Sequence, residues 1–412
     1  MNTFSFIIAA SVVVILSYVF NIISKKTSIP SVLMLIATGM IIKQMMVALN
    51  IPLKDLMPSL EILGTVGLIM IVLEAALDLK LSKEKWPTIW KSFTVGLLGL
   101  VFSSFAAAMV INYFAIHDPM VALVYAIPLS IMSSAIIIPS VGDLEPAKKE
   151  FMIYESTFSD ILGIMFFYFL VGNLEASSAN EVLSDVIINI SLTIVLSIIV
   201  SYGLILIFQK LTAQVKLFLL IAVLLLLYSI GKLFHLSSLI IILVFGLLLN
   251  NHTLFFRGKM RKLINPEALK GTLHDFHLVT METAFVVRTF FFVIFGITIS
   301  LGSLVDLQVT IISLLIIAGL YGVRWCVLKL ILGKSVTPEL YIAPRGLITI
   351  LLFFAIPDDI KAEGFNSAIL LFVIITTSII MTISLISEGK KKKEEIQETS
   401  EEEAEGAIAE IE

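Results

Sequence analysis

The sequence predicts an all-α polytopic membrane protein of about 13 transmembrane helices. Of its 412 residues, 58% are hydrophobic and only 15% are charged, and the mean hydropathy is +1.03. A soluble chain of this length could not cover that much apolar surface, because globular domains carry roughly 25% charged residues. Apolar runs of about 17 to 25 residues, long enough to cross a bilayer as helices, recur along the chain. The alternating segments of about 10 residues that are typical of a membrane barrel do not appear.

The predicted spans and the basic residues between them give an orientation. The spans are residues 4–23, 29–48, 60–79, 92–115, 120–142, 151–171, 183–209, 215–231, 236–250, 281–301, 308–328, 338–357 and 366–387. With the N-terminus outside, 21 of the 28 lysines and arginines fall on the inner side, four fall outside and three lie within spans. Because inner loops carry an excess of basic residues, we expect an outer N-terminus and a cytoplasmic C-terminus, in a bacterial inner membrane.

Two spans carry residues that break a helix. These are Pro128, Ser133, Ser134 and Pro139 in the fifth span, and Pro338, Pro344, Arg345 and Gly346 in the twelfth. Backbone groups freed by proline are tolerated at membrane depth only where they face protein or a wet cavity. Both broken spans are fifth in two possible inverted repeats, about 1–171 and 215–387, and matching broken helices indicate a midplane ion site. We expect a membrane domain over 1–387 and a disordered, charged tail over 388–412.

Buried charges are the candidate functional residues. Glu155 and Asp160 lie in the sixth span, where a carboxylate costs several kcal/mol unless it is paired, hydrated or protonated. Arg345 cannot lose its proton in the broken twelfth span, so it is the natural partner of Glu155. Asp160 then remains to bind an ion.

Other charged and polar residues carry weaker signals. Arg288 is a possible accessory charge that could instead extend to the interface, as we expect for Arg324, and Glu74 could line an inner cavity. The set His274, Asp275, His277 and Glu282 lacks the fixed third ligand of a metal site, so no metal is expected. With one cysteine, no phosphate-binding loop and no nucleophile motif, the sequence favours neither a cofactor, nor a nucleic-acid partner, nor an enzyme.

Three short motifs resemble the cation/proton antiporter superfamily. Residues 154–160, Tyr-Glu-Ser-Thr-Phe-Ser-Asp, are similar to the Glu-Ser-x-x-Asn-Asp signature of its NhaP-like sodium/proton exchanger branch. Residues 343–346, Ala-Pro-Arg-Gly, resemble the arginine–glycine motif of that branch. Residues 132–136, Met-Ser-Ser-Ala-Ile, look like a stretch of the related potassium-efflux branch. The similarity in layout runs from about residue 5 to residue 387.

The resemblance implies a homodimer of thirteen-helix subunits, each with a core domain around crossed, broken spans and a dimerisation domain. It implies exchange of a monovalent cation, Na⁺ before K⁺ or Li⁺, for H⁺ by an elevator-type movement that serves pH homeostasis. Asp160 would bind the cation or the proton, Ser159, Ser156, Ser133 and Ser134 would surround the ion, and Glu155 and Arg345 would form a structural ion pair. Ser159 replaces the usual Asn, and the fifth span lacks the Thr-Asp-Pro of many NhaP-like proteins. A single acidic residue resembles the electroneutral subgroup.

Two other interpretations remain open. On a similar inverted-repeat fold, a sodium-coupled organic-anion symporter would use Arg345 to bind the carboxylate of its substrate. Alternatively, the chain could be a non-transporting membrane sensor, or an intramembrane enzyme with a site at His274, His277 and Glu282. Replacement of Arg345 separates the first alternative from an antiporter, and metal analysis of the purified protein tests the last.

Overall fold

The computed structural model describes residues 3–409, except 28, 50–56, 83, 143, 175–178, 210–215, 234–237, 257–265, 299–305, 334–335 and 363–364, and these described residues form helices, turns and extended connections. The first part of the chain forms α1 (Thr3–Thr27), α2 (Ser31–Ala48), α3 (Met57–Asp78), α4 (Trp86–Phe114), α5 (Pro119–Ser130), α6 (Ser134–Ser140) and α7 (Pro146–Gly172). The second part forms α8 (Ala179–Phe208), α9 (Lys216–Leu233), α10 (Ser238–Asn250), α11 (His252–Phe255), α12 (Pro266–Thr298), α13 (Leu307–Leu332), α14 (Leu347–Phe354), the 3₁₀ helix η3 (Asp358–Ile360) and α15 (Ala368–Ala409).

The helices have the length and composition of membrane spans. Within the described residues, nine helical segments are long and apolar enough to cross a bilayer, and α5 and α6 together make one of them. Three shorter apolar segments lie in α8, α9 and α10. The predicted all-α polytopic class is confirmed. The number of thirteen spans and the inverted repeats stay predictions, because several of the expected spans are shorter than a full crossing.

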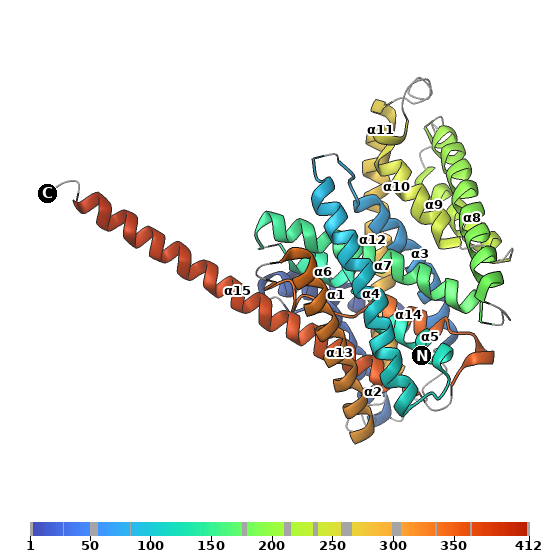
Figure 1. The fold of residues 1–412 in the computed structure, drawn as a ribbon, viewed down its shortest axis with the longest axis horizontal. Helices are drawn as coiled ribbons and strands as arrows, with labels where there is room; N and C mark the ends of the chain where they lie inside the picture. Colours follow the sequence, from blue (N-terminus) through green and yellow to red (C-terminus); the bar gives the residue numbers. More distant parts are fainter. Residues whose placement is uncertain are drawn as a thin grey trace.

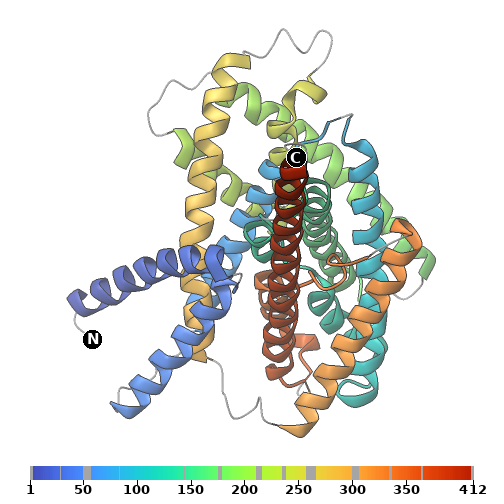
Figure 2. The same ribbon diagram turned by 90° about the vertical axis from the view of Figure 1, so that its left-hand side faces the viewer.

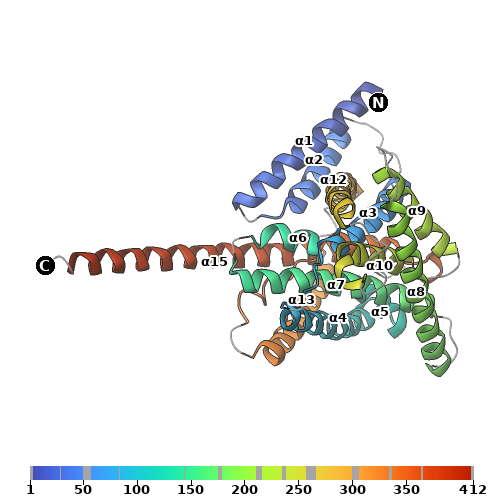
Figure 3. The ribbon, with the colours of Figure 1, turned by 90° about the horizontal axis from the view of Figure 1, so that it is seen from above.

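The helices pack mainly within two sets. The core helices are α4, α5, α6, α7, α13, α14 and α15, and the scaffold helices are α1, α2, α3, α8, α9, α10, α11 and α12. Figure 3 shows α4, α7 and α13 together on one side of the molecule and α1, α2 and α12 on the other. Contacts between the sets are sparser, and they join α14 and α7 to α3, α6 to α1, and α7 to α10. Both broken segments belong to the core helices.

Small residues let two scaffold helices approach closely. A Cβ atom on Gly39 of α2 would lie 2.2 Å from the carbonyl oxygen of Val293, and one on Gly296 of α12 would lie 2.3 Å from that of Ile36. Such contacts between backbones are possible only where both helices present glycine at the crossing. The α2–α12 pair is therefore a tightly joined part of the scaffold.

The C-terminal residues differ from the prediction. α15 continues as one helix through Ala409, and Figure 1 shows its second half projecting away from the bundle. In Figure 2 the same helix lies in front of the other helices. The expectation of disorder over 388–412 rested on the absence of apolar periodicity. However, lysine, glutamate and alanine are also good helix formers, so a helix that has started in the membrane can continue through them.

Candidate functional site

Two unwound segments cross at the centre of the core helices. The fifth span stops at Ser130, where α5 ends, and restarts at Ser134, where α6 begins. Residues 342–346 are likewise non-helical and lead into α14. The segments are joined where the N–H of Ser133 donates to the carbonyl of Pro344 at 2.9 Å. A Cβ atom on Gly346 would lie 2.4 Å from Ser133 Oγ, so only glycine allows this close crossing.

Asp160 of α7 faces this crossing. Its side chain is buried, at 2% exposure, and Oδ2 accepts the N–H of Ser134 at 3.1 Å. Its Oδ1 is buried and has no hydrogen-bond partner among the described residues. Asp160 also takes part in none of the ion pairs found in the described part of the chain. A buried carboxylate without a cation is stable only if a proton or a bound ion neutralises it.

The predicted serines take different positions. Ser159 lies beside the break, because its Oγ accepts the N–H of Met132 at 3.0 Å. Ser133 lies in the break, and Ser134, the first residue of α6, donates its backbone N–H to Asp160. Ser156 is fully buried, but its hydroxyl donates to the carbonyl of Ile153 on its own helix at 3.2 Å. The structure therefore brings Ser159, Ser133 and Ser134 to the crossing, while Ser156 is bonded within α7.

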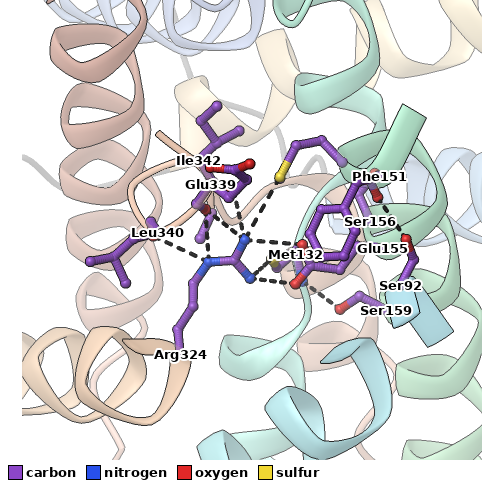
Figure 4. A network of polar contacts seen from close by, with 12 residues as sticks. Ser92, Met132, Phe151, Glu155, Ser156, Ser159, Arg324, Glu339, Leu340 and Ile342 are labelled. Carbon is purple, nitrogen blue, oxygen red and sulfur yellow. Dashed lines mark hydrogen bonds and ion pairs between the residues drawn. The ribbon is translucent and has the colours of Figure 1, made fainter. Parts of the chain in front are cut away.

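Glu155 pairs with Arg324, and the predicted pair with Arg345 is wrong. Arg324 Nη2 lies 3.1 Å from Glu155 Oε2, and Nη1 bonds to Oε1, so the pair is bidentate. The same guanidinium donates to the carbonyls of Glu339 at 2.7 Å and Leu340 at 3.1 Å. Figure 4 shows it between Glu155 of α7 and the segment that precedes α14. Arg324 thus does not extend to the interface, because its 7% exposed side chain ties three core elements together.

Arg345 has a different task. Its Nε donates to the carbonyl of Leu129 at 2.9 Å, its Nη2 to that of Ser130 at 3.3 Å, and its Nη1 to that of Ala343. Leu129 and Ser130 are the last residues of α5, where helix carbonyls lack partners and the helix dipole is negative. Arg345 therefore caps the broken end of α5 without a carboxylate.

A cavity of about 400 Å³ leads to the break. It lies between α6 of the core and the scaffold helices α1, α2, α3 and α12, and its wall includes Ser134 and Asp78. Arg288 and Glu74 also line it and lie 3.4 Å apart, between Nη2 and Oε2. Glu74 therefore lines this cavity, where Arg288 pairs with it.

The histidine cluster does not form a metal site in the described residues. His277 Nε2 lies 2.9 Å from Asp78 Oδ1 at the cavity wall. No three His, Cys, Asp or Glu side chains within the described ranges come together as metal ligands would. The intramembrane-enzyme alternative at His274, His277 and Glu282 therefore gains no support from the structure.

Two buried charged residues were missed as members of the core. The sequence offers three arginines within spans and does not tell which of them meets Glu155, because helix positions give no information on contacts between distant helices. Glu339 is 5% exposed, and its buried Oε2 has no hydrogen-bond partner among the residues that the structure describes. It directly follows Pro338 at the start of the predicted twelfth span, and no role was predicted for it. The departure of residues 337–341 from a helix buries it.

Comparisons with known proteins give one match by sequence and several by structure. A family model described as "Sodium/hydrogen exchanger, transmembrane" matches residues 9–387. Among solved structures, that of the sodium proton antiporter MjNhaP1 from Methanocaldococcus jannaschii at pH 8 has a TM-score of 0.67 and 23% identity, and covers 95% of this chain and 100% of that chain. An electron-microscopy map of the same antiporter has a TM-score of 0.66 and 22% identity, and covers 95% and 96%. No curated protein matches the chain.

Proposed function

Because the chain belongs to the sodium/hydrogen exchanger family, we propose that it exchanges a monovalent cation for H⁺ at Asp160. The observation that carries this proposal is that the buried Asp160 has no cationic partner among the described residues. Its carboxylate is buried at the crossing of two broken segments. Within the described part of the chain, its Oδ1 has no hydrogen-bond partner either. Of the buried carboxylates of the core, it is the one that accepts the N–H of Ser134, the residue at which the fifth span becomes helical again.

Exchange follows from the chemistry of one carboxylate. A hard monovalent cation favours oxygen ligands, and Asp160 Oδ1, the hydroxyls near the break and carbonyls freed by unwinding supply them. A proton neutralises the same oxygen atom, so the two ions compete for one place. If the core moves only when Asp160 is neutral, each outward cation is matched by an inward proton. This one-for-one competition corresponds to electroneutral exchange.

The two helix sets support an elevator-type mechanism. The cavity lies between α6 and the scaffold helices and reaches Ser134, whose backbone N–H bonds to Asp160, so an ion entering it would come close to the site. Strong contacts inside each set and sparser contacts between them favour movement of the core as a unit. With the N-terminus outside, the cavity opens to the cytoplasm, and we propose a homodimer joined through the scaffold in a bacterial inner membrane.

We propose Na⁺ as the cation, with K⁺ and Li⁺ as alternatives for the same site. The sodium-coupled symporter is less well supported, because each of the three guanidinium nitrogens of Arg345 donates to a backbone carbonyl, of Leu129, Ser130 or Ala343, and the side chain is thereby fixed at the end of α5. The family also disfavours the non-transporting sensor and an enzyme.

Proton flux in proteoliposomes tests the proposal. Vesicles loaded with a pH-sensitive dye receive a gradient of Na⁺, K⁺ or Li⁺, and we expect exchange by the wild type. Asp160→Asn is expected to reduce it to the rate of empty vesicles. Asp306→Asn is the matched control, because it makes the same change at an exposed residue that caps α13, where Asn also accepts the N–H of Gln308. Normal exchange by Asp160→Asn would show that another residue carries the ion.

A further inference from the structure

The connection between α3 and α4 is one of the places where the chain passes from the scaffold to the core. It comprises residues 79–85, and its first three residues are held by side chains from both sets. Asp78, which directly precedes it, lines the cavity that leads to Ser134. Any movement of the core against the scaffold must therefore change how this connection is held.

The scaffold holds the connection through the end of α10. The buried side chain of Asn251 accepts the N–H of Leu81 at 2.7 Å and donates to the carbonyl of Leu79 at 2.8 Å. Asn250 donates to the same carbonyl at 3.2 Å. Asn251, which directly follows α10, also donates to the carbonyl of Leu247 in that helix at 3.0 Å. The side chain of Asn251 thus both accepts from and donates to the backbone of residues 79–81, and these hydrogen bonds fix the segment to the end of α10.

A core helix holds Lys80, which lies between Leu79 and Leu81. The phenol of Tyr154, on α7, donates to the carbonyl of Lys80 at 2.8 Å. The ring is 6% exposed and packs with Leu79 and Ile89 in a small apolar cluster that is separate from the main core. Tyr154 lies about one and two-thirds turns before Asp160 on the same helix, so it moves with the exchange site.

We infer that Tyr154 and Asn251 form a clamp on residues 79–81 that stabilises the arrangement in which the cavity is open. This inference rests on the proposed function, because it concerns the movement by which the core carries Asp160. Residues 79–81 are bonded to the scaffold, so the core can leave this position only if Tyr154 releases Lys80. Tyr154 is thus a positioning residue. It does not contact the ion, but it sets the fraction of protein molecules that are in the arrangement with the open cavity.

Loss of the Tyr154 hydrogen bond is expected to shift the equilibrium between the arrangement that faces the cavity side and the one that faces the opposite side. A net hydrogen bond contributes about 1 kcal/mol, so its loss should change the ratio of the two arrangements about fivefold. The apparent affinity for Na⁺ on each side is proportional to the fraction of the protein that faces that side, so it falls when that fraction falls. The ratio of the half-saturating Na⁺ concentrations, cavity side over opposite side, should therefore rise about fivefold whatever the initial balance.

The test uses Tyr154→Phe, which removes only the hydroxyl. The half-saturating Na⁺ concentration is measured at each face of the protein. Two vesicle preparations are used, in which the protein is inserted in opposite orientations. Two tyrosines serve as controls, because their hydroxyls bond within one set: Tyr202 donates to Phe255 at 3.3 Å in the scaffold, and Tyr125 accepts the N–H of Ala362 at 2.9 Å in the core. We expect the ratio to change in Tyr154→Phe and to stay at the wild-type value in Tyr202→Phe and Tyr125→Phe.

A second variant tests whether the two residues act as a unit. Asn251→Ala should raise the ratio in the same direction, and combining it with Tyr154→Phe should add little, because both act on residues 79–81. An unchanged ratio in Tyr154→Phe, or a double variant whose change is the product of the two single changes, would overturn the clamp. If exchange still depends on Asp160 in that case, the proposed function stands and only the clamp fails.

Discussion

Glu155 and Asp160 lie five residues apart on α7, yet their surroundings differ in the one respect that matters for transport. Both are buried, at 1% and 2% exposure. Glu155 receives two donors from Arg324, which is itself bonded to Glu339 and Leu340. Asp160 receives the N–H of Ser134 and no cation among the described residues. A carboxylate paired with arginine fixes the core, whereas an unpaired one at the same depth has a free place for an ion.

The largest expected effect comes from breaking the paired carboxylate. Glu155→Gln should lower the free energy of unfolding by about 3–5 kcal/mol, because it leaves the charge of Arg324 buried without a counter-ion. Denaturant unfolding in detergent measures this change. Combining Glu155→Gln with Arg324→Met should recover part of the loss. If Glu155→Gln unfolds like the wild type, the pair is not what holds α7 to the segment before α14.

A smaller loss is expected at the other buried arginine. Arg345→Lys keeps the charge but cannot reach the carbonyls of Leu129, Ser130 and Ala343 together, so unfolding should become easier by about 2 kcal/mol. The same denaturant titration applies. Equal stability of Arg345→Lys and the wild type would show that these carbonyls are satisfied without the guanidinium fork.

The smallest expected change in the free energy of unfolding is that of Asp160→Asn, and it should be a stabilisation. In the absence of Na⁺ at alkaline pH, Asp160→Asn should raise the free energy of unfolding by about 1 kcal/mol, because it replaces a buried charge that lacks a partner with a neutral amide. The gain should shrink as Na⁺ is added to the wild type, since a bound cation stabilises only the protein that binds it. Destabilisation of Asp160→Asn under these conditions would mean that Asp160 has a structural partner.

The sequence predicted the class of fold and the breaks in two spans better than it predicted contacts. Proline, paired serines and glycine mark the breaks because they act locally, through a lost backbone donor and a missing Cβ. The depth of Asp160 also follows from its position in an apolar run. The partner of Glu155 did not follow, since Arg324, 169 residues away in sequence, meets it only through the packing of α13. The clamp on residues 79–81 likewise depends on the packing of three helices.

Competition between Na⁺ and H⁺ in the wild-type protein tests the central claim most directly. Initial rates of exchange are measured over a range of Na⁺ concentrations at several pH values, with equal pH on both sides of the vesicle membrane. If one carboxylate binds either ion, lowering the pH should raise the half-saturating Na⁺ concentration, by about tenfold per pH unit where protons occupy the site, and saturating Na⁺ should restore the maximal rate. A maximal rate that falls with pH while the half-saturating concentration stays constant would contradict a shared site at Asp160.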